Sequence, residues 1–474
     1  AGATDGHIAD CANLGAVSSA SASSDSAAAG IAGAGAGTVE TSYNAGSVKA
    51  AANGAYLATT LTADGTYEDL VRASFYLAPG NEAAYEGIAV ADRDGFLPPD
   101  ELQAAAELLN DGREGDAVVW SSGDPDRTSG YPAPARPANP NAAQAEPEAE
   151  SEALAAEPAP AAADDPAPAA TPIFKNWLEV AEAVDQGKYG MGSYKEDPLA
   201  VSTPEGFAYS LYCAYRNTDN NIVLANAIDV SGTSYTADGS PLPWTCWNIE
   251  SNIQLDGAGC TISGMRVWAD GRSTDHHTSA VSNMAGLGLF AGTVHSGSSE
   301  LKAVVTNLTL EGVIDMTTAG SNILPNAAGS VVGYLGYEEC PASLSLRNVT
   351  SNVEVKSRGY AGGLVGAVGG AAVCEMQSCT NKGTIYADGE MFPENLMNWS
   401  HSSLNNIKKF NADPRNYHFA IAGGLVGAIL PTVGSARFTA SDCKNIGTVT
   451  SPVLYAGGLV GWYAGQDLGI ETKE

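Results

Sequence analysis

Short apolar runs bounded by glycines recur along the chain and predict very short β-strands. The hexapeptide Ala-Gly-Gly-Leu-Val-Gly occurs three times, at residues 361–366, 422–427 and 456–461. In the first copy Leu364 and Val365 stand between glycines, which tolerate tight corners and close backbone approach best. A strand of two or three residues is therefore expected between two corners. Strands this short cannot bury a face alone, so we expect them to stack in parallel at about 4.8 Å around one shared interior.

A second motif follows the first two hexapeptides, and it also opens the chain. Its four copies lie at residues 11–17, 42–48, 379–385 and 443–449, each with Asn at the third position and Gly at the fifth. In stacked coils these asparagines would form a ladder of side chains. The alternative is that each Asn only serves its own turn, a role that suits this residue. The fixed offset within a two-part repeat favours the ladder.

The repeat predicts which residues set the corners and layers of the stack. The ladder asparagines near the N-terminus are Asn13 and Asn44. The remaining repeat positions are Gly363, Leu364, Gly366, Asn381, Gly383, Gly424, Leu425, Gly427, Asn445, Gly447, Gly458, Leu459 and Gly461.

With these two motifs the sequence resembles the GLUG-motif repeat family of bacterial secreted and surface proteins. The same repeats occur in non-catalytic regions of some large surface peptidases. The resemblance is strongest at residues 1–50 and 327–465. It implies an all-β fold, a parallel β-helix (β-solenoid) with short capping helices, and it implies no chemistry.

Composition divides the first part of the chain into a solenoid segment and a linker. Residues 1–136 are interpreted as the C-terminal part of a first solenoid with a closing cap. A helix is expected at 99–109, where proline and acidic residues occupy the first turn. In proteins of the GLUG type, a helix followed by Gly-Tyr-Pro often closes the array. Residues 137–171 are rich in Pro, Ala and Glu and lack aromatics, which predicts a disordered, extended spacer between two solenoid segments.

The remainder is interpreted as a second solenoid. Residues 172–310 are expected to form its N-terminal cap and first coils, with a helix starting at Thr203 and Pro204. Residues 311–474 are expected to form the repeat coils. The hexapeptide recurs 61 residues after its first copy but only 34 after its second, so the excess, 387–419, is predicted to be a surface insertion.

Aromatic residues give two candidate contact regions. Trp399, Tyr417 and Phe419 lie in the insertion and form the candidate binding surface, because a long excursion that the coil does not need often carries function. Packing within the loop is the equally weighted alternative. A second group is expected to pack inside the cap: Trp244, Trp247 and Trp268.

Charge excludes two classes of partner. The chain has 23 Lys and Arg against 54 Asp and Glu, a formal net charge of −31. No basic stripe is present to neutralise phosphates, which argues against nucleic acid and against anionic membrane surfaces. No apolar run reaches the length of a membrane span. The chain opens inside a repeat, so we interpret it as a fragment whose signal and anchor lie elsewhere.

Residues able to perform chemistry are few. The enzyme alternative, a carbohydrate-active β-helix enzyme, predicts clustered carboxylates beside His, Lys or Arg, and the sequence offers none. His276 and His277 stand in a polar loop without nearby carboxylates. Residues 92–102 partly match a calcium loop, but Val90 stands at the first ligand position and cannot coordinate. We expect no catalytic residues, no metal and no cofactor.

The eight cysteines lack metal-binding spacing. Cys11, Cys379 and Cys443 share one repeat position, which Ser42 occupies in the fourth copy, so small inward thiols are favoured over an obligatory disulfide. A local bridge between Cys374 and Cys379 remains open.

These features lead to one functional expectation. The chain is expected to be a non-enzymatic secreted or surface-displayed bacterial protein, an adhesin-like rod that binds a host or matrix protein or glycan. The non-catalytic stalk of a surface peptidase, or spacing without any ligand, remains an alternative.

Overall fold

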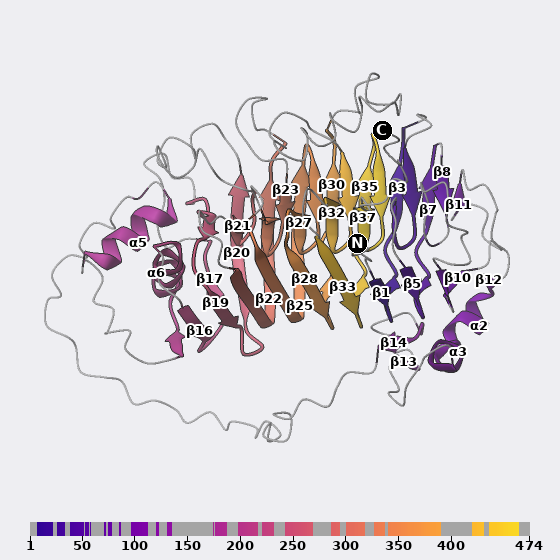
Figure 1. The fold of residues 1–474 in the computed structure, drawn as a ribbon, viewed down its shortest axis with the longest axis horizontal. Coiled ribbons are helices and arrows are strands. Elements are labelled where there is room, and N and C mark those ends of the chain that lie inside the picture. Colours follow the sequence, from indigo (N-terminus) through magenta and orange to yellow (C-terminus); the bar gives the residue numbers. More distant parts are fainter. Residues whose placement is uncertain are drawn as a thin grey trace, which may run out of the picture.

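The structure is a computed structural model. It describes residues 7–21, 26–33, 38–51, 53–55, 57, 71–72, 74–77, 85–86, 96–111, 120–122, 130–134, 174, 176–186, 198–216, 220–231, 242–268, 286–293, 300–317, 327–336, 340–389, 420–430 and 436–463. The fold is a parallel β-solenoid, as predicted, in which short strands from successive coils stack side by side (Figure 1). The linker 137–171 and the calcium-like segment at 92–95 lie outside the described residues.

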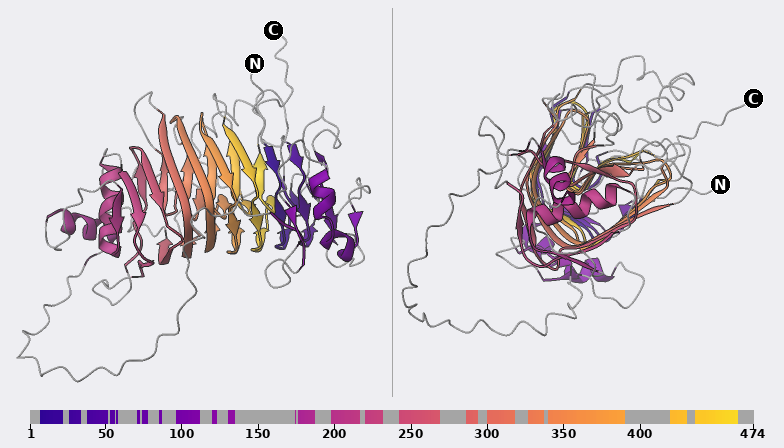
Figure 2. Two further views of the ribbon diagram at one scale, coloured as in Figure 1. Left: turned by 90° about the horizontal axis from the view of Figure 1, so that it is seen from below. Right: turned by 90° about the vertical axis from the view of Figure 1, so that its left-hand side faces the viewer.

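The central coils pass through three parallel sheets, which we name A, B and C. One coil shows the path: β25 (Ala342–Ser357) lies in sheet A, β26 (Tyr360–Gly362) in sheet B and β27 (Val365–Gly369) in sheet C. The chain then returns to sheet A in β28 (Val373–Gln377). Seen along the stack, the coils superpose on one another (Figure 2).

The remaining strands repeat this order. Sheet A also contains β1 (His7–Ala9), β2 (Ala12–Asn13), β3 (Val17–Ser19), β5 (Thr38–Glu40), β6 (Tyr43–Asn44), β7 (Val48–Ala50), β9 (Val71–Arg72), β10 (Phe75–Leu77), β11 (Tyr85–Glu86), β12 (Phe96–Leu97), β15 (Leu199–Val201), β16 (Asn220–Leu224), β17 (Ile228–Asp229), β19 (Ile253–Asp256), β20 (Thr261–Trp268), β22 (Leu301–Asp315), β29 (Thr380–Asn381), β30 (Ile385–Ala387), β33 (Arg437–Ser441), β34 (Lys444–Asn445) and β35 (Val449–Ser451). Sheet B also contains β4 (Ala27–Ala29), β8 (Asn53–Ala55), β23 (Ala327–Gly329), β31 (Ile421–Gly423) and β36 (Tyr455–Gly457). Sheet C also contains β18 (Trp247–Ile249), β21 (Phe290–Thr293), β24 (Val332–Leu335), β32 (Val426–Leu430) and β37 (Val460–Tyr463).

The hexapeptide forms a corner between two strands, which corrects the expected strand at Leu364 and Val365. Its first residues end β26, Gly363 and Leu364 turn the chain, and Val365 starts β27. A Cβ atom on Gly363 would lie 2.0 Å from the carbonyl oxygen of Gly424 in the next coil. Glycine is required there because the corner of one coil sits directly on the corner of the next. Leu364 itself points into the interior and is fully buried.

A helical cap covers the first coils. α5 (Trp177–Asp185) and α6 (Pro204–Tyr215) lie at that end of the stack (Figure 1). The predicted start of α6 is confirmed, since the hydroxyl of Thr203 accepts a hydrogen bond from the backbone N–H of Gly206 at 3.1 Å. Trp244 stacks on Phe207 with ring centroids 5.7 Å apart and is 3% exposed, so it packs in the cap as expected.

A second cap covers the opposite end. The helix expected at 99–109 is present as two short helices, α2 (Pro99–Gln103) and α3 (Ala106–Asp111). The break at residues 104–105 allows Leu102 and Leu109 both to be fully buried. Their cluster includes Tyr43 and Trp120, whose ring centroids are 5.3 Å apart. Trp120 belongs to β13 (Trp120–Ser121), which pairs antiparallel with β14 (Ala133–Pro134).

The two solenoid segments on either side of the linker form one stack. β1 pairs in parallel with β33 on one side and with β5 on the other, so the N-terminal coils follow the C-terminal coils in space. The same junction continues in sheet B, where β36 pairs with β4. Figure 1 shows this as indigo strands beside yellow ones. The order of coils in the stack is therefore a circular permutation of their order in the sequence.

Candidate functional site

The predicted asparagine ladder runs through the interior and crosses the junction. The Nδ2 atom of Asn381 donates to the Oδ1 atom of Asn445 at 2.8 Å, and that of Asn445 donates to Asn13 at 2.9 Å. Asn13 then donates to Asn44 at 2.8 Å. All four side chains are fully buried. The ladder therefore spans two coils from each part of the chain without interruption.

Each rung also holds its own turn. The Nδ2 atom of Asn13 donates to the carbonyl oxygen of Gly15 at 2.9 Å, and the N–H of Gly15 donates back to Oδ1 at 3.2 Å. Asn381 makes the same two bonds with Gly383, and the Nδ2 atom of Asn445 donates to the carbonyl of Gly447 at 2.8 Å. The asparagines therefore have both expected roles, because each Asn stabilises its own turn and also forms a rung of the ladder.

The ladder explains why the hexapeptide and the second motif occur together in the sequence. A Cβ atom on Gly363 would lie 2.6 Å from Cγ of Asn381, so the corner glycine and the rung of one coil are in contact. Gly424 meets Asn445 in the same way. Gly458 meets Asn13, again at 2.6 Å, although 445 positions separate them in the chain. The coil that the third hexapeptide opens is therefore completed by the N-terminal segment.

A row of left-handed residues precedes the second motif and was missed by sequence reasoning. No glycine marks these positions in the sequence. Short polar side chains that bond to nearby backbone can also adopt the left-handed conformation. Asp10, Thr41, Ser378 and Asp442 have positive φ directly before the four copies of the motif, and Asn307 and Asn348 have it at the equivalent place in earlier coils. Ala258, between two glycines, also has positive φ. Rungs form here too: the Thr41 hydroxyl donates to Asp10 at 2.6 Å, and Asn348 donates to Asn307 at 3.0 Å. This second row fixes the bend of sheet A.

The three repeat cysteines stack in one buried column. The thiols of Cys443, Cys379 and Cys11 each donate to the backbone carbonyl two residues earlier, at 3.2, 3.4 and 3.0 Å. Ser42 takes the next place, and its hydroxyl accepts from the N–H of Cys11 at 3.1 Å. No disulfide joins any of the eight cysteines, Cys374 and Cys379 included. Burial raises the pKa of the Cys379 and Cys443 thiols, which disfavours the reactive thiolate.

We expect the native chain to expose at most two reactive thiols. Six cysteines are buried, and Cys213 and Cys260 are half-buried. Burial raises the pKa of Cys246 to about 12 from its ordinary 9.0. The unfolded state then loses its thiol protons first, so the free energy of unfolding falls as pH rises above about 9. Titration with an aromatic disulfide should count at most two thiols when folded and eight in denaturant; fast reaction of more than two when folded would contradict the column.

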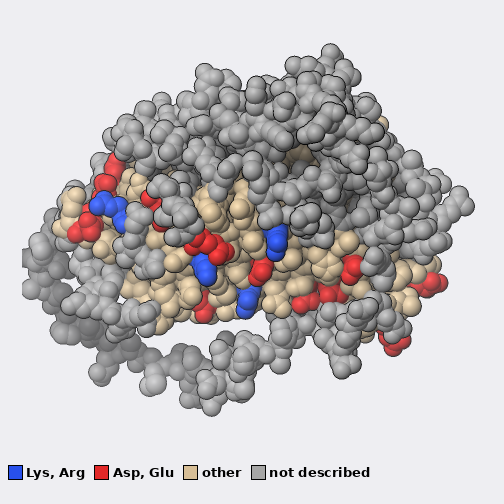
Figure 3. Space-filling model, viewed as in Figure 1, with Lys and Arg blue, Asp and Glu red and all other residues tan. Residues whose placement is uncertain are grey.

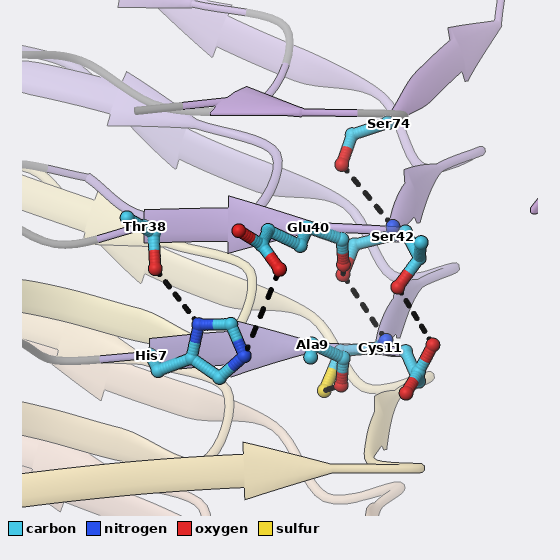
Figure 4. Close-up of polar contacts among 9 residues, drawn as sticks. His7, Ala9, Cys11, Thr38, Glu40, Ser42 and Ser74 are labelled. Carbon is cyan, nitrogen blue, oxygen red and sulfur yellow. Dashed lines mark hydrogen bonds and ion pairs between the residues drawn. The ribbon is translucent and has the colours of Figure 1, made fainter. Parts of the chain in front are cut away.

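One polar group on sheet A has the residue types of a hydrolase. The Nδ1 atom of His7 is 2.8 Å from the hydroxyl of Thr38, and its Nε2 atom is 4.0 Å from Glu40 (Figure 4). The three residues lie on adjacent strands, β1 and β5, across one pairing. The side chains of His7 and Glu40 are 43% and 33% exposed. Water and salt therefore screen the pair, and we interpret it as a surface contact between coils.

Three long segments outside the described residues begin and end at one corner, between sheet A and sheet B, which we name the insertion edge. Residues 269–285, 318–326 and 390–419 each connect a sheet A strand to the next sheet B position at this edge. Other coils close the same corner tightly, as at Arg358 and Gly359 between β25 and β26. Trp399, Tyr417 and Phe419 belong to the third insertion and lie outside the described residues, as do His276 and His277.

The foot of the third insertion carries charged side chains. Burial raises the pKa of the Asp388 carboxyl, and the charge of Arg358 acts in the opposite direction. In the adjacent strand the Nζ atom of Lys356 lies 2.7 Å from Glu354, and this hydrogen bond raises the pKa of the lysine. Figure 3 shows acidic and basic side chains spread among uncharged ones, with no basic stripe across the described residues of that face.

The described residues were also searched for metal sites and membrane-spanning helices, and the chain was compared with known proteins. Within the part of the chain that the structure describes, no group of three His, Cys, Asp or Glu could hold a metal ion. No helix among those residues is long and apolar enough to cross a membrane. Comparison of the chain with protein-family models, curated proteins and solved structures gives no match.

Proposed function

We propose that this chain is a non-enzymatic secreted or cell-surface protein that binds a host or matrix protein or glycan through its insertion edge. The observation that carries the proposal is the common origin of the three insertions. They start from the coils of β20, β22 and β30, so their starting points lie along one edge of a stiff support. Binding residues commonly lie on loops held by such a scaffold.

The rest of the coil suits a support. The interior is filled with fully buried leucine, valine and alanine layers, and the ladder is fully hydrogen-bonded. Helical caps cover the two ends that are most exposed to pairing with other strands. The resemblance to GLUG-motif repeats, which implies a surface protein of bacterial origin and no chemistry, points the same way.

The structure allows the third insertion to be removed cleanly. Ala387 is in register with Ser357, and Ile421 with Tyr360, the strand residues that flank the tight corner of the neighbouring coil. Deleting residues 389–419 leaves Asp388 and Ala420 as a two-residue corner of that same length. The Asp388 N–H already donates to the carbonyl of Ser357 at 3.0 Å, so the new corner starts in the right geometry.

We expect this deletion to remove binding and to leave the fold intact. The full chain and the deletion variant would be compared on arrays of glycans and extracellular-matrix proteins, with circular dichroism and melting temperature as the check on folding. Binding should weaken at least tenfold, and Trp399→Ala in the full chain should reproduce part of that loss. The full chain is used because residues 7–57 complete the stack that carries the insertion.

The matched control removes another insertion from the same edge. Deleting residues 318–325 leaves Met316, Thr317 and Asn326 between β22 and β23. The N–H of Met316 still pairs with the carbonyl of Lys356 at 2.9 Å, so only Thr317 and Asn326 remain to form the corner. Binding that survives this deletion but not the first would place the site on the third insertion. Equal binding by the full chain and both variants would overturn that placement, and absence of binding by all three would favour the spacer or stalk alternative.

A further inference from the structure

The N-terminal segment meets the C-terminal coils at a junction. The hydrogen bonds across this junction are the same as those between neighbouring coils elsewhere in the stack. The N–H of Ala12 donates to the carbonyl of Cys443 at 2.9 Å, and the N–H of Gly458 donates to Ala29 at 3.1 Å. Within the continuous part of the stack, Lys444 and Cys379 make the corresponding bond at 2.9 Å. The two parts of the chain therefore recognise each other through backbone pairing, the rung at Asn13 and the corner at Gly458.

Each part has one end covered by a helical cap, and its other end is covered only by the other part. β33, β35 and β36 have their outer edges paired by β1, β3 and β4. The helices that close this end of the stack, α2 and α3, pack on the N-terminal segment, against Tyr43. Separation would leave unpaired strand edges and an open ladder on both surfaces, which is a template for pairing with another chain.

The linker is long enough for the junction to form within one chain, but it does not prevent the same junction from forming between two chains. Nine successive strand pairings, from β15 to β9, separate the two ends of sheet A. At about 4.8 Å each this is about 43 Å. Residues 135–173 reach up to about 120 Å at about 3.1 Å per residue. A linker of this kind gives an effective concentration on the order of millimolar, so a dense array of copies can compete with it.

We propose that the junction is a self-recognition surface whose other partner is a second copy of this chain. Residues 7–134, the N-terminal coils with their cap, then act as a donor segment, which completes the coil opened at 455–463 either in its own chain or in a neighbour. Reciprocal exchange gives a closed dimer, and one-way exchange gives an open row of capped solenoids joined by their linkers. On a crowded surface the same contact would join neighbouring molecules through their linkers, while each solenoid keeps its length and its two caps. The proposal does not depend on the insertion edge.

Shortening the linker provides the test. Deleting residues 138–170 leaves six linker residues, with a reach of at most about 25 Å, which is too short to close the junction within one chain. By light scattering after gel filtration, the full chain should be a monomer at micromolar concentration and the shortened chain a dimer or larger. The far-ultraviolet circular dichroism should stay the same. A folded, monomeric shortened chain would overturn the proposal.

A circularly permuted chain tests whether the solenoid folds without the linker when the junction is formed by a continuous backbone. Residues 172–474 followed directly by 1–136 contain no linker, but the coil is then continuous through the former termini. This variant should be a stable monomer. If it folds and the shortened chain unfolds, the junction is needed for folding but is not exchanged, and the second-copy proposal fails.

Cross-linking detects exchange directly in the full chain. Ser18 and Thr450 are in register across the junction, with their hydroxyls 3.3 Å apart, and both are half-buried. Ser18→Cys and Thr450→Cys would be made in separate chains, mixed, unfolded and refolded together at high concentration, and treated with a short bismaleimide. A mixed dimer linked through these two positions supports exchange. The control is a single chain that carries both cysteines, which should cross-link well. If this control cross-links and the mixture gives no peptide linked through the two positions, exchange between chains is contradicted.

Discussion

Gly15→Val is expected to destabilise the chain by more than about 3 kcal/mol by forcing the junction apart. A Cβ atom on Gly15 would lie 1.8 Å from the carbonyl oxygen of Gly447 and 2.9 Å from the ladder nitrogen of Asn445. The carbonyl is backbone in the adjacent coil, so no side-chain rotation relieves the contact. Unfolding in urea, followed by circular dichroism, should show a much lower midpoint or loss of the cooperative transition.

Two controls separate the junction from the local turn. Ala16→Val alters the next residue, which is exposed, and should change the free energy of unfolding by less than about 0.5 kcal/mol. Gly447→Val makes the same clash inside the continuous stack, where its Cβ would lie 1.9 Å from the carbonyl of Gly383. If Gly15→Val cost far less than Gly447→Val, the two parts of the chain would not be stacked in solution.

Much of the coil could be predicted because its signals are local. Glycine in each hexapeptide marks a place where backbone meets backbone, and the repeated offset of the asparagines marks a ladder. The strand assignment at Leu364 failed because an apolar residue between glycines can equally point inward from a corner. The left-handed bend at Ser378 and Asp442 was missed since it is encoded by polar residues rather than by glycine.

The joining of the two segments could not be read from either segment alone. Which strand edge pairs with which is decided in space, and the linker hides the proximity of the ends. The contact of Gly458 with Asn13 shows that the hexapeptide at 456–461 and the motif at 11–17 belong to one coil. The candidate binding residue Trp399 stays a prediction, because it lies outside the described residues.

Asn13→Ala is expected to cost about 2–4 kcal/mol, because it leaves several buried polar groups without partners. Asn13 takes part in four hydrogen bonds, two with Gly15 and one each with Asn445 and Asn44. Alanine cannot replace any of them, and the site is fully buried, so water does not compensate. The free energy of unfolding from urea titration measures the loss.

The position of a rung in the ladder sets the size of the effect, and this makes the test specific. Asn44 ends the row of four, with one bond from Asn13 and two within its own turn to Gly46. Asn44→Ala should therefore cost less than Asn13→Ala or Asn445→Ala, which interrupt the row. Equal costs for all three would mean that each asparagine acts only within its own turn. A double variant, Asn13→Ala with Asn445→Ala, should cost less than the sum of the single changes, because the two side chains share a hydrogen bond that is lost only once.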